Sequence, residues 1–241
     1  MTSMPVYNAL STQKELERLL ELRAHNLSNA GTEGFLSRNA HISGGSKFGS
    51  GVHYARNSGF FTNMAQGPLR HTGDRLDVAF DGKTFLAVGT QTGEALTKSG
   101  KLIITKEGEL QTASGFPVLE EGGGRIIIPP ETATINISND GFISTENGQV
   151  GRLRLVQVKN PAQNLSHASG NLFTVKKENL ITDENMRVQQ YFVNGSNVNP
   201  ILEVTAILKI QKQYQQTMGM VENIVKISND GTENLLSTLP V

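Results

Sequence analysis

Histidines and cysteines are the residues through which this chain could bind a metal or activate a nucleophile. The 241-residue sequence contains five histidines and no cysteine. The histidines are His25, His41, His53, His71 and His167. No two of them lie three to five positions apart, as a zinc-binding pair on one helix would require. The missing cysteine excludes disulfides, thiolate metal sites and cysteine nucleophiles. We therefore expect no metal and no cofactor.

The tightest group of carboxylates is formed by Asp74, Asp77 and Asp81. Paired carboxylates can hydrolyse a glycosidic bond when their separation suits a sugar. However, Asp77 lies between Leu76 and Val78 in an expected strand, and Asp81 lies in an expected turn, where aspartate is common. The structural interpretation is favoured, and a β-rich carbohydrate-active enzyme remains the alternative from a different functional class.

Glycine runs could cradle a phosphate if a helix followed them. The run at residues 122–124 precedes an expected strand instead, and the runs at 44–45 and 49–51 lack the lysine and spacing of a nucleotide loop. The turn at residues 139–141 lacks the other ligands of a calcium loop. The sequence therefore predicts no small-molecule substrate.

The charge of the chain is balanced, with 22 Lys and Arg against 22 Asp and Glu. A net charge of zero gives no electrostatic footprint for nucleic acid, and it lets many copies pack without a large charge barrier. The first twenty residues lack the basic start and apolar core of a signal peptide. No apolar run approaches the ~18 residues of a membrane span. We expect no membrane insertion and no cleaved signal peptide.

A helix is predicted over residues 3–29, because its apolar residues recur on one face between polar ones. Leu16, Leu20 and Leu27 belong to this apolar stripe, and Pro5 suits the first helical turn. The sequence around Asn29 then ends the helix in the manner of a glycine cap.

A second helix is predicted over residues 196–227, with Ser196 or Asn199 as its cap and Pro200 just inside its start. Its apolar stripe contains Ile207, Ile210, Tyr214, Met218, Val221, Ile224 and Val225. The run ISNDG occurs at residues 137–141, in a predicted hairpin, and again at 227–231, where we expect it to end this helix.

The middle of the chain, roughly residues 36–195, alternates short apolar runs with turn signals. Hairpins are predicted for residues 76–88, 102–113 and 135–144, and one strand for 151–158. The expected fold class is mixed and mainly β: an antiparallel β body inserted between N- and C-terminal amphipathic helices that pair. Two paired helices bury only one face each, so the remaining apolar surface requires partners.

Several ordered motifs span nearly the whole chain. They read NLSNAGTEGF at residues 26–35, QGPL at 66–69, LDVAF at 76–80, LTKSG at 96–100 and GSNVN at 195–199. Together they resemble the flagellar rod and hook protein family. The chain departs from the family pattern at Leu36, Thr84, Leu96 and Lys212. The segments at 66–69, 151–156 and 233–236 resemble proximal-rod members more than the distal-rod protein, which remains the alternative.

The resemblance implies a non-enzymatic subunit of the periplasmic rod of the flagellar basal body. Such subunits polymerise around the export channel, transmit torque, and leave the cell through the flagellar type III apparatus. It implies that other rod proteins and copies of the chain itself are the partners. It also implies a helical axial domain from residues 1–35 and 196–241, a connecting β region at 36–75 and an outer β domain at 76–195.

The apolar stripes of the two helices, together with the motifs that carry the resemblance, give the expected assembly and motif residues. On the first helix and its end they are Leu16, Leu20, Asn26, Leu27, Asn29, Gly34 and Phe35. On the second helix they are Ser196, Asn197, Val198, Asn199, Ile207, Gln211, Tyr214, Met218, Val221 and Ile224. The motif of the β body contributes Gln66, Gly67, Leu69, Leu76, Asp77, Val78 and Ala79.

Overall fold

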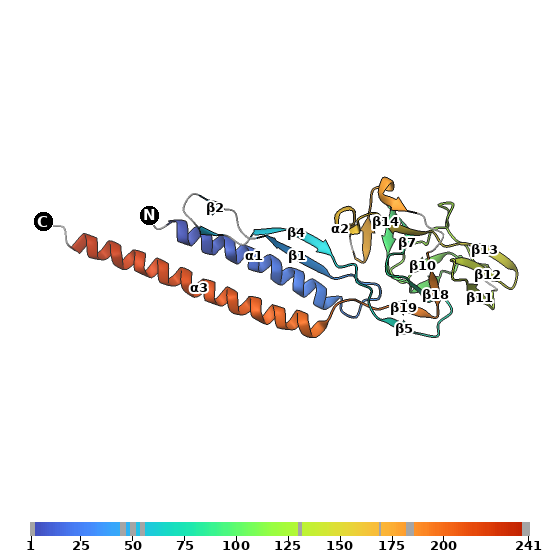
Figure 1. The fold of residues 1–241 in the computed structure, drawn as a ribbon. Coiled ribbons are helices and arrows are strands. Elements are labelled where there is room, and N and C mark those ends of the chain that lie inside the picture. Colours follow the sequence, from blue (N-terminus) through green and yellow to red (C-terminus); the bar gives the residue numbers. More distant parts are fainter. Residues whose placement is uncertain are drawn as a thin grey trace. The chain divides into compact units, whose positions relative to one another are not determined.

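The computed structural model describes residues 3–43, 47–48, 52–53, 56–129, 132–168, 170–181 and 186–237. The chain divides into two compact units, and each is built from segments far apart in the sequence (Figure 1). Unit 1 contains Met1–Ser28, Asn39–Phe60 and Asn199–Val241, and unit 2 contains Asn29–Arg38 and Phe61–Val198. Neither unit can therefore fold from one continuous stretch of chain.

Unit 1 is dominated by two long helices that lie side by side, α1 (Ser3–Ser28) and α3 (Pro200–Ser237) (Figure 1). A two-stranded sheet joins β1 (Arg38–Ser43) to β4 (Arg56–Thr62), and a second short pair joins β2 (Lys47–Phe48) to β3 (Val52–His53). The predicted start of α1 at residue 3 is confirmed, and the helix ends at Ser28, one residue before the predicted end.

The start of α3 follows the predicted cap chemistry. The side-chain Oδ1 of Asn199 accepts hydrogen bonds from the backbone amides of Ile201 and Leu202, at 3.1 and 3.3 Å. Pro200 occupies the first helical position, where its missing amide hydrogen costs nothing. The predicted end at residue 227 is wrong, because α3 continues through residues 229–231 to Ser237. A single glycine disfavours a helix by only ~1 kcal/mol and does not by itself end one.

Unit 2 is centred on a six-stranded antiparallel sheet in the order β15-β16-β8-β7-β14-β17. Its strands are β7 (Phe85–Thr90), β8 (Gly93–Thr97), β14 (Leu155–Val158), β15 (Ser166–His167), β16 (Leu172–Thr174) and β17 (Leu180–Ile181). The short helices α2 (Pro161–Asn164) and η1 (Lys177–Asn179) lie in its connections.

Smaller antiparallel sheets complete unit 2. A three-stranded sheet contains β11 (Ile135–Ile137), β12 (Phe142–Thr145) and β13 (Gly148–Arg152). Three strand pairs join β9 (Leu102–Ile104) to β10 (Leu110–Thr112), β18 (Val188–Gln190) to β6 (Val78–Phe80), and β19 (Phe192–Asn194) to β5 (Leu69–His71).

Two of the three predicted hairpins are confirmed, namely β9–β10 and β11–β12. The predicted hairpin over residues 76–88 is wrong. Strand β6 pairs with β18, which belongs to the return segment (residues 186–199), while β7 pairs with β8 and β14. The single strand predicted over residues 151–158 is also divided, between β13 and β14. The first difference arises from pairing with a distant segment. The second arises because β13 pairs with the adjacent β12, whereas β14 pairs with the distant β7.

The central sheet buries apolar side chains on both faces, because neighbouring residues of a strand point to opposite sides. In β7, Leu86 and Val88 belong to the first core, whereas Phe85 and Ala87 belong to the second. The first core extends into the smaller sheets, and the second is much smaller. The predicted class, mixed and mainly β with a helix at each end, is confirmed. Within the described ranges, neither long helix is apolar enough to cross a membrane.

Candidate assembly interface

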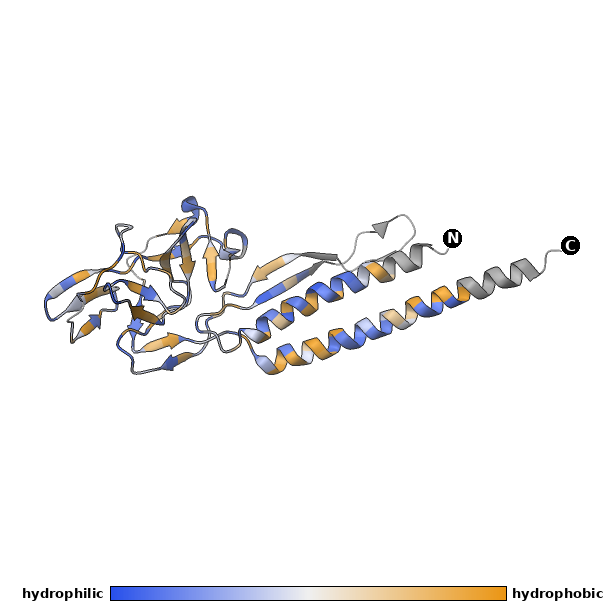
Figure 2. Cartoon of the chain, turned by 180° about the vertical axis from the view of Figure 1, so that it is seen from behind, coloured by the Kyte–Doolittle hydropathy of each residue, from blue (hydrophilic) through white to orange (hydrophobic). Residues whose placement is uncertain are grey.

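The two long helices contact each other, and apolar and polar residues alternate along both of them (Figure 2). Leu16 and Leu22 of α1 and Ile210 of α3 are buried. The predicted stripe residues Leu20 and Leu27 are half-buried. Leu22 was not predicted, although it is more deeply buried than either of them. The helix pair therefore uses part of the predicted stripe for its own packing.

A polar cluster joins the end of α1 to the start of α3. The Arg23 guanidinium donates to both carboxylate oxygens of Glu203, at 3.3 and 3.4 Å. Asn26, which is fully buried, donates from Nδ2 to the same carboxylate at 3.3 Å. Arg23 also donates to Oδ1 of Asn39 in β1. Because a buried carboxylate requires such partners, this cluster fixes the register of the two helices.

Two of the predicted residues of α3, Tyr214 and Met218, contact side chains of α1. Ile207, Tyr214, Val221 and Ile224 are half-buried, whereas Gln211 and Met218 are exposed. The Tyr214 hydroxyl donates to Oε1 of Glu17, and the Gln13 amide of α1 contacts Met218 Sδ.

A second apolar face on α3 was not predicted. Ile201, Val204 and Leu208 lie at spacings of three and seven residues, so they share one face of the helix. All three are exposed, with Ile201 at 76% and Leu208 at 61% of their full accessible areas. Glu203 and Ile210, which contact α1, lie on a different face and are buried. The periodicity in the sequence marks apolar positions without showing which face meets α1.

The motif after α1 makes a sharp turn within unit 2. The carbonyl and side-chain Oδ1 of Asn29 accept hydrogen bonds from Thr32. Gly34 adopts a φ of +69°, and a Cβ there would lie 2.3 Å from the backbone of Lys98. Its amide donates to the Asn194 carbonyl at 2.7 Å, and Phe35 is buried. Only glycine fits this position.

The return segment of unit 2 uses side-chain amides in place of missing strand neighbours. Asn194 accepts from the Phe80 amide at 2.7 Å and donates to the Phe80 carbonyl at 2.9 Å. Asn197 accepts from the Ser37 amide at 2.6 Å and donates to the carbonyls of Asn63 and Ala65.

Two more residues of this segment, Gln190 and Ser196, form further hydrogen bonds. Gln190 bonds in the same way to Ile137, Ile135 and Arg75. Ser196 Oγ accepts from the amide of Val198, which is buried. Gln190 and Asn194 were not predicted, although amides among the apolar residues of a strand were a usable signal.

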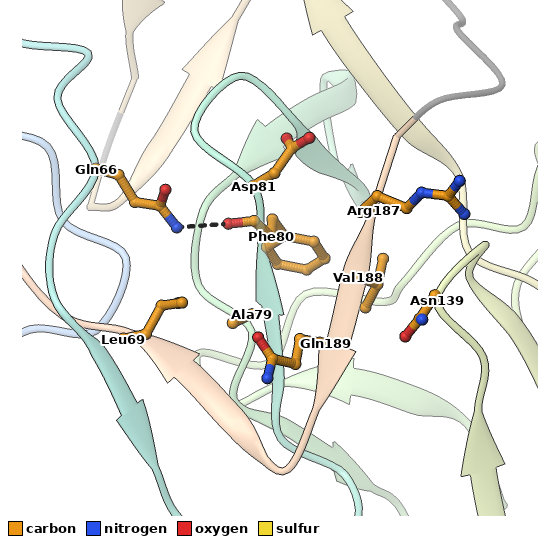
Figure 3. A pocket seen from close by; sticks show the side chains of 9 residues that line it. All are labelled: Gln66, Leu69, Ala79, Phe80, Asp81, Asn139, Arg187, Val188 and Gln189. Carbon is orange, nitrogen blue, oxygen red and sulfur yellow. Dashed lines mark hydrogen bonds between the residues drawn. The ribbon is translucent and has the colours of Figure 1, made fainter.

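The β-body motif divides between the core and a shallow hollow of about 420 Å³ (Figure 3). Asp77, Val78 and Ala79 are buried, and Leu76 is half-buried. Figure 3 shows Gln66 and Leu69 facing the strand that carries Ala79, and Gln66 Nε2 donates to the Phe80 carbonyl at 3.2 Å.

A close backbone contact explains why residue 67 of this motif is a glycine. A Cβ on Gly67 would lie 2.0 Å from the carbonyl oxygen of Gly195. The motif thus fixes how residues 66–69 pack against the return segment.

Lys98 is buried in unit 2 and has an unusual environment. Its Nζ donates to the Asp81 carbonyl at 2.6 Å and lies 4.9 Å from the centre of the Phe85 ring. Burial lowers the pKa of Lys98 from 10.5 to about 8, and the nearby charge of Asp81 opposes this shift.

Comparison with known proteins identifies the family of this chain. Residues 79–145 match the domain described as flagellar hook protein FlgE/F/G D1, and residues 189–229 match the flagellar basal body rod FlgEFG protein C-terminal domain. The flagellar basal-body rod protein FlgF of Caulobacter vibrioides is 32% identical, and the match covers 95% of this chain and 97% of that protein. This chain belongs to the flagellar basal-body rod proteins. FlgF of Mesorhizobium japonicum is 30% identical with the same coverage, whereas the rod protein FlgG of Bacillus subtilis is 24% identical over 90% of this chain.

The rod family is structural and not enzymatic, and the carboxylate cluster of this rod protein agrees with that. Asp74 Oδ1 accepts from the Leu76 amide and Asp81 Oδ1 accepts from the Thr84 amide, both at 3.0 Å. Both aspartates therefore stabilise turns. Among the described residues, no group of three or more histidine, aspartate or glutamate side chains could hold a metal ion.

Proposed function

We propose that this rod protein is a structural subunit of the proximal rod that polymerises around the export channel and transmits torque. One observation carries the proposal: α3 has apolar side chains on two faces, and only one of them contacts α1. Ile201, Val204 and Leu208 are exposed to water on this helix. A neighbouring subunit that covers them would stabilise the assembly by roughly 25 cal/mol for each Å² of apolar surface buried.

The helix pair supplies the assembly surface in this proposal. Leu20, Ile207, Val221 and Ile224 are half-buried in the single chain, so neighbouring subunits would complete their burial. The exposed Gln211 and Met218 belong to the same proposed surface. The partners are other rod proteins and further copies of this chain. The subunit reaches the periplasm through the flagellar type III apparatus.

Paired substitutions on α3 test the proposal. Leu208→Asp places a charge on a residue that is exposed in the single chain, so we expect an unchanged circular dichroism spectrum and melting temperature but no motility. Ile210→Asp places the same charge in the buried contact with α1, so we expect lower helix stability as well as lost motility. Normal swimming by the Leu208→Asp strain, with the variant present at wild-type level, would contradict the proposal.

A further inference from the structure

A second hollow of unit 2, of about 690 Å³, opens where β7 begins and β14 ends. Phe85 and Val158, both members of the second core, line it together with Met64 and Ile181. Phe85 itself is completely buried, so the hollow reaches the apolar interior of the unit. Ile181 is exposed and Met64 is half-buried, so these two lining residues leave apolar surface open to water at this point.

Two lysines lie at this hollow and give it a charge. Lys83 and Lys159 line it and are exposed, and none of the described residues that line it is a carboxylate. Neither lysine forms an ion pair with any residue in the described ranges. Seven arginines of the same ranges do pair with a carboxylate. In a chain whose formal charge is zero, the two lysines leave an unbalanced positive charge beside an apolar surface.

These properties define the chemistry of a complementary partner. An apolar side chain would remove the accessible surface of Ile181 and Met64 from water, which is the larger favourable contribution to binding. Carboxylates next to that side chain would meet the two lysines. Charges at the edge of an interface mainly guide the approach and select the partner.

We propose that this hollow is a docking site for a neighbouring protein subunit of the rod, which inserts an apolar side chain flanked by carboxylates. The inference rests on the proposed function, because it requires that the chain is assembled. It adds a contact made by the β unit to the contacts made by the helices. It also assigns a role to Lys83 and Lys159, which none of the sequence motifs include.

Site-specific photo-crosslinking in the assembled flagellum tests this site. Gln157, which lines the hollow, is replaced by p-benzoylphenylalanine, and Gln149, an exposed glutamine of β13 outside the hollow, is replaced in a control. After irradiation, hook–basal bodies are purified and the crosslinked peptides are identified by mass spectrometry. We expect position 157 to crosslink to an apolar residue with an aspartate or glutamate within a few positions on another protein chain.

A charge series then tests the lysines. The double variant Lys83→Met and Lys159→Met should lower the crosslink yield at position 157 by about three- to tenfold, the effect of two partly exposed ion pairs. The control double variant Lys101→Met and Lys106→Met removes the same charge from exposed positions outside the hollow and should leave the yield unchanged.

The outcomes separate the two proposals. If the chain is present in purified hook–basal bodies but position 157 crosslinks no better than position 149, the docking site is wrong and the rod assignment stands. A crosslink only to residues 182–185 of the same chain, or a yield that ignores both lysine pairs, also overturns it. If the chain is absent from hook–basal bodies, the proposed function fails and this inference fails with it.

Discussion

Replacing Gly34 by alanine tests whether the turn after α1 is as constrained as its geometry indicates. The new Cβ would lie 2.3 Å from the carbonyl carbon and oxygen of Lys98 and 2.4 Å from the Ser99 amide nitrogen. All three atoms belong to the backbone, so no side-chain rotation can relieve the overlap. In addition, the φ of +69° costs a residue other than glycine roughly 1–2 kcal/mol.

The expected loss of stability follows from these two contributions. Forcing an extra carbon into a packed site costs about 1–3 kcal/mol, so with the backbone strain the total is about 2–5 kcal/mol. Urea unfolding with a slope of about 2–3 kcal/mol per molar would show a midpoint lower by roughly 1–2 M. The assay is urea titration of the full chain, followed by circular dichroism in the β region.

A matched control lies in the same turn. A Cβ added to Gly31 would meet no atom within 4 Å, and the φ of this residue is not positive. Gly31→Ala should therefore leave the midpoint unchanged or raise it slightly. Equal midpoints for Gly34→Ala and the unchanged chain would refute the steric argument, and so would equal losses in the two variants.

Two further predictions concern ionisable groups. The folded chain releases the Lys98 proton near pH 8 and the unfolded chain near 10.5, so the free energy of unfolding should rise by about 3 kcal/mol between these pH values. Urea midpoints from pH 7.5 to 10.5 measure this rise, and Lys98→Met should abolish it; an unchanged slope in that variant would exclude Lys98 as its source. Arg23→Met leaves the buried Glu203 carboxylate with fewer partners and should cost about 1–3 kcal/mol in thermal unfolding at 222 nm. The double variant Arg23→Met and Glu203→Leu should recover part of that loss, and no recovery would argue against a paired contact.

The sequence predicts those parts of the fold that depend on local periodicity and turn chemistry. The start of α1, the Asn199 cap and the hairpins β9–β10 and β11–β12 are of this kind. Local sequence patterns do not predict pairing between distant segments. For this reason the sequence analysis did not predict the partner of β6. The distant strand β18, and not the adjacent β7, pairs with β6.

The repeated run ISNDG shows the same limit most directly. At residues 137–141 it forms the turn between β11 and β12, where Gly141 has a φ of +82°. At residues 227–231 the same five residues continue α3. Since the local sequence is identical, only the surroundings can decide between turn and helix.

The assembly surface was predicted only in part, because the local sequence does not show which helix face meets the neighbouring helix. Hydrophobic spacing identified the stripe that contains Ile207, Tyr214 and Val221, but these residues border the contact with α1. The exposed face with Ile201 and Leu208 follows only when the neighbouring helix is in place. Likewise, the side-chain amides of Gln190 and Asn194 form hydrogen bonds with backbone groups more than 50 residues away, so their role cannot be predicted from the local sequence.

Quantitative mass spectrometry of purified hook–basal bodies from the source bacterium asks whether this chain is a subunit of the proximal rod. We expect it to co-purify with the other rod proteins at a few copies per rod. A several-fold higher copy number would move it to the distal rod. Its absence from the complex, with the protein recovered from the cytoplasm instead, would contradict the proposed role.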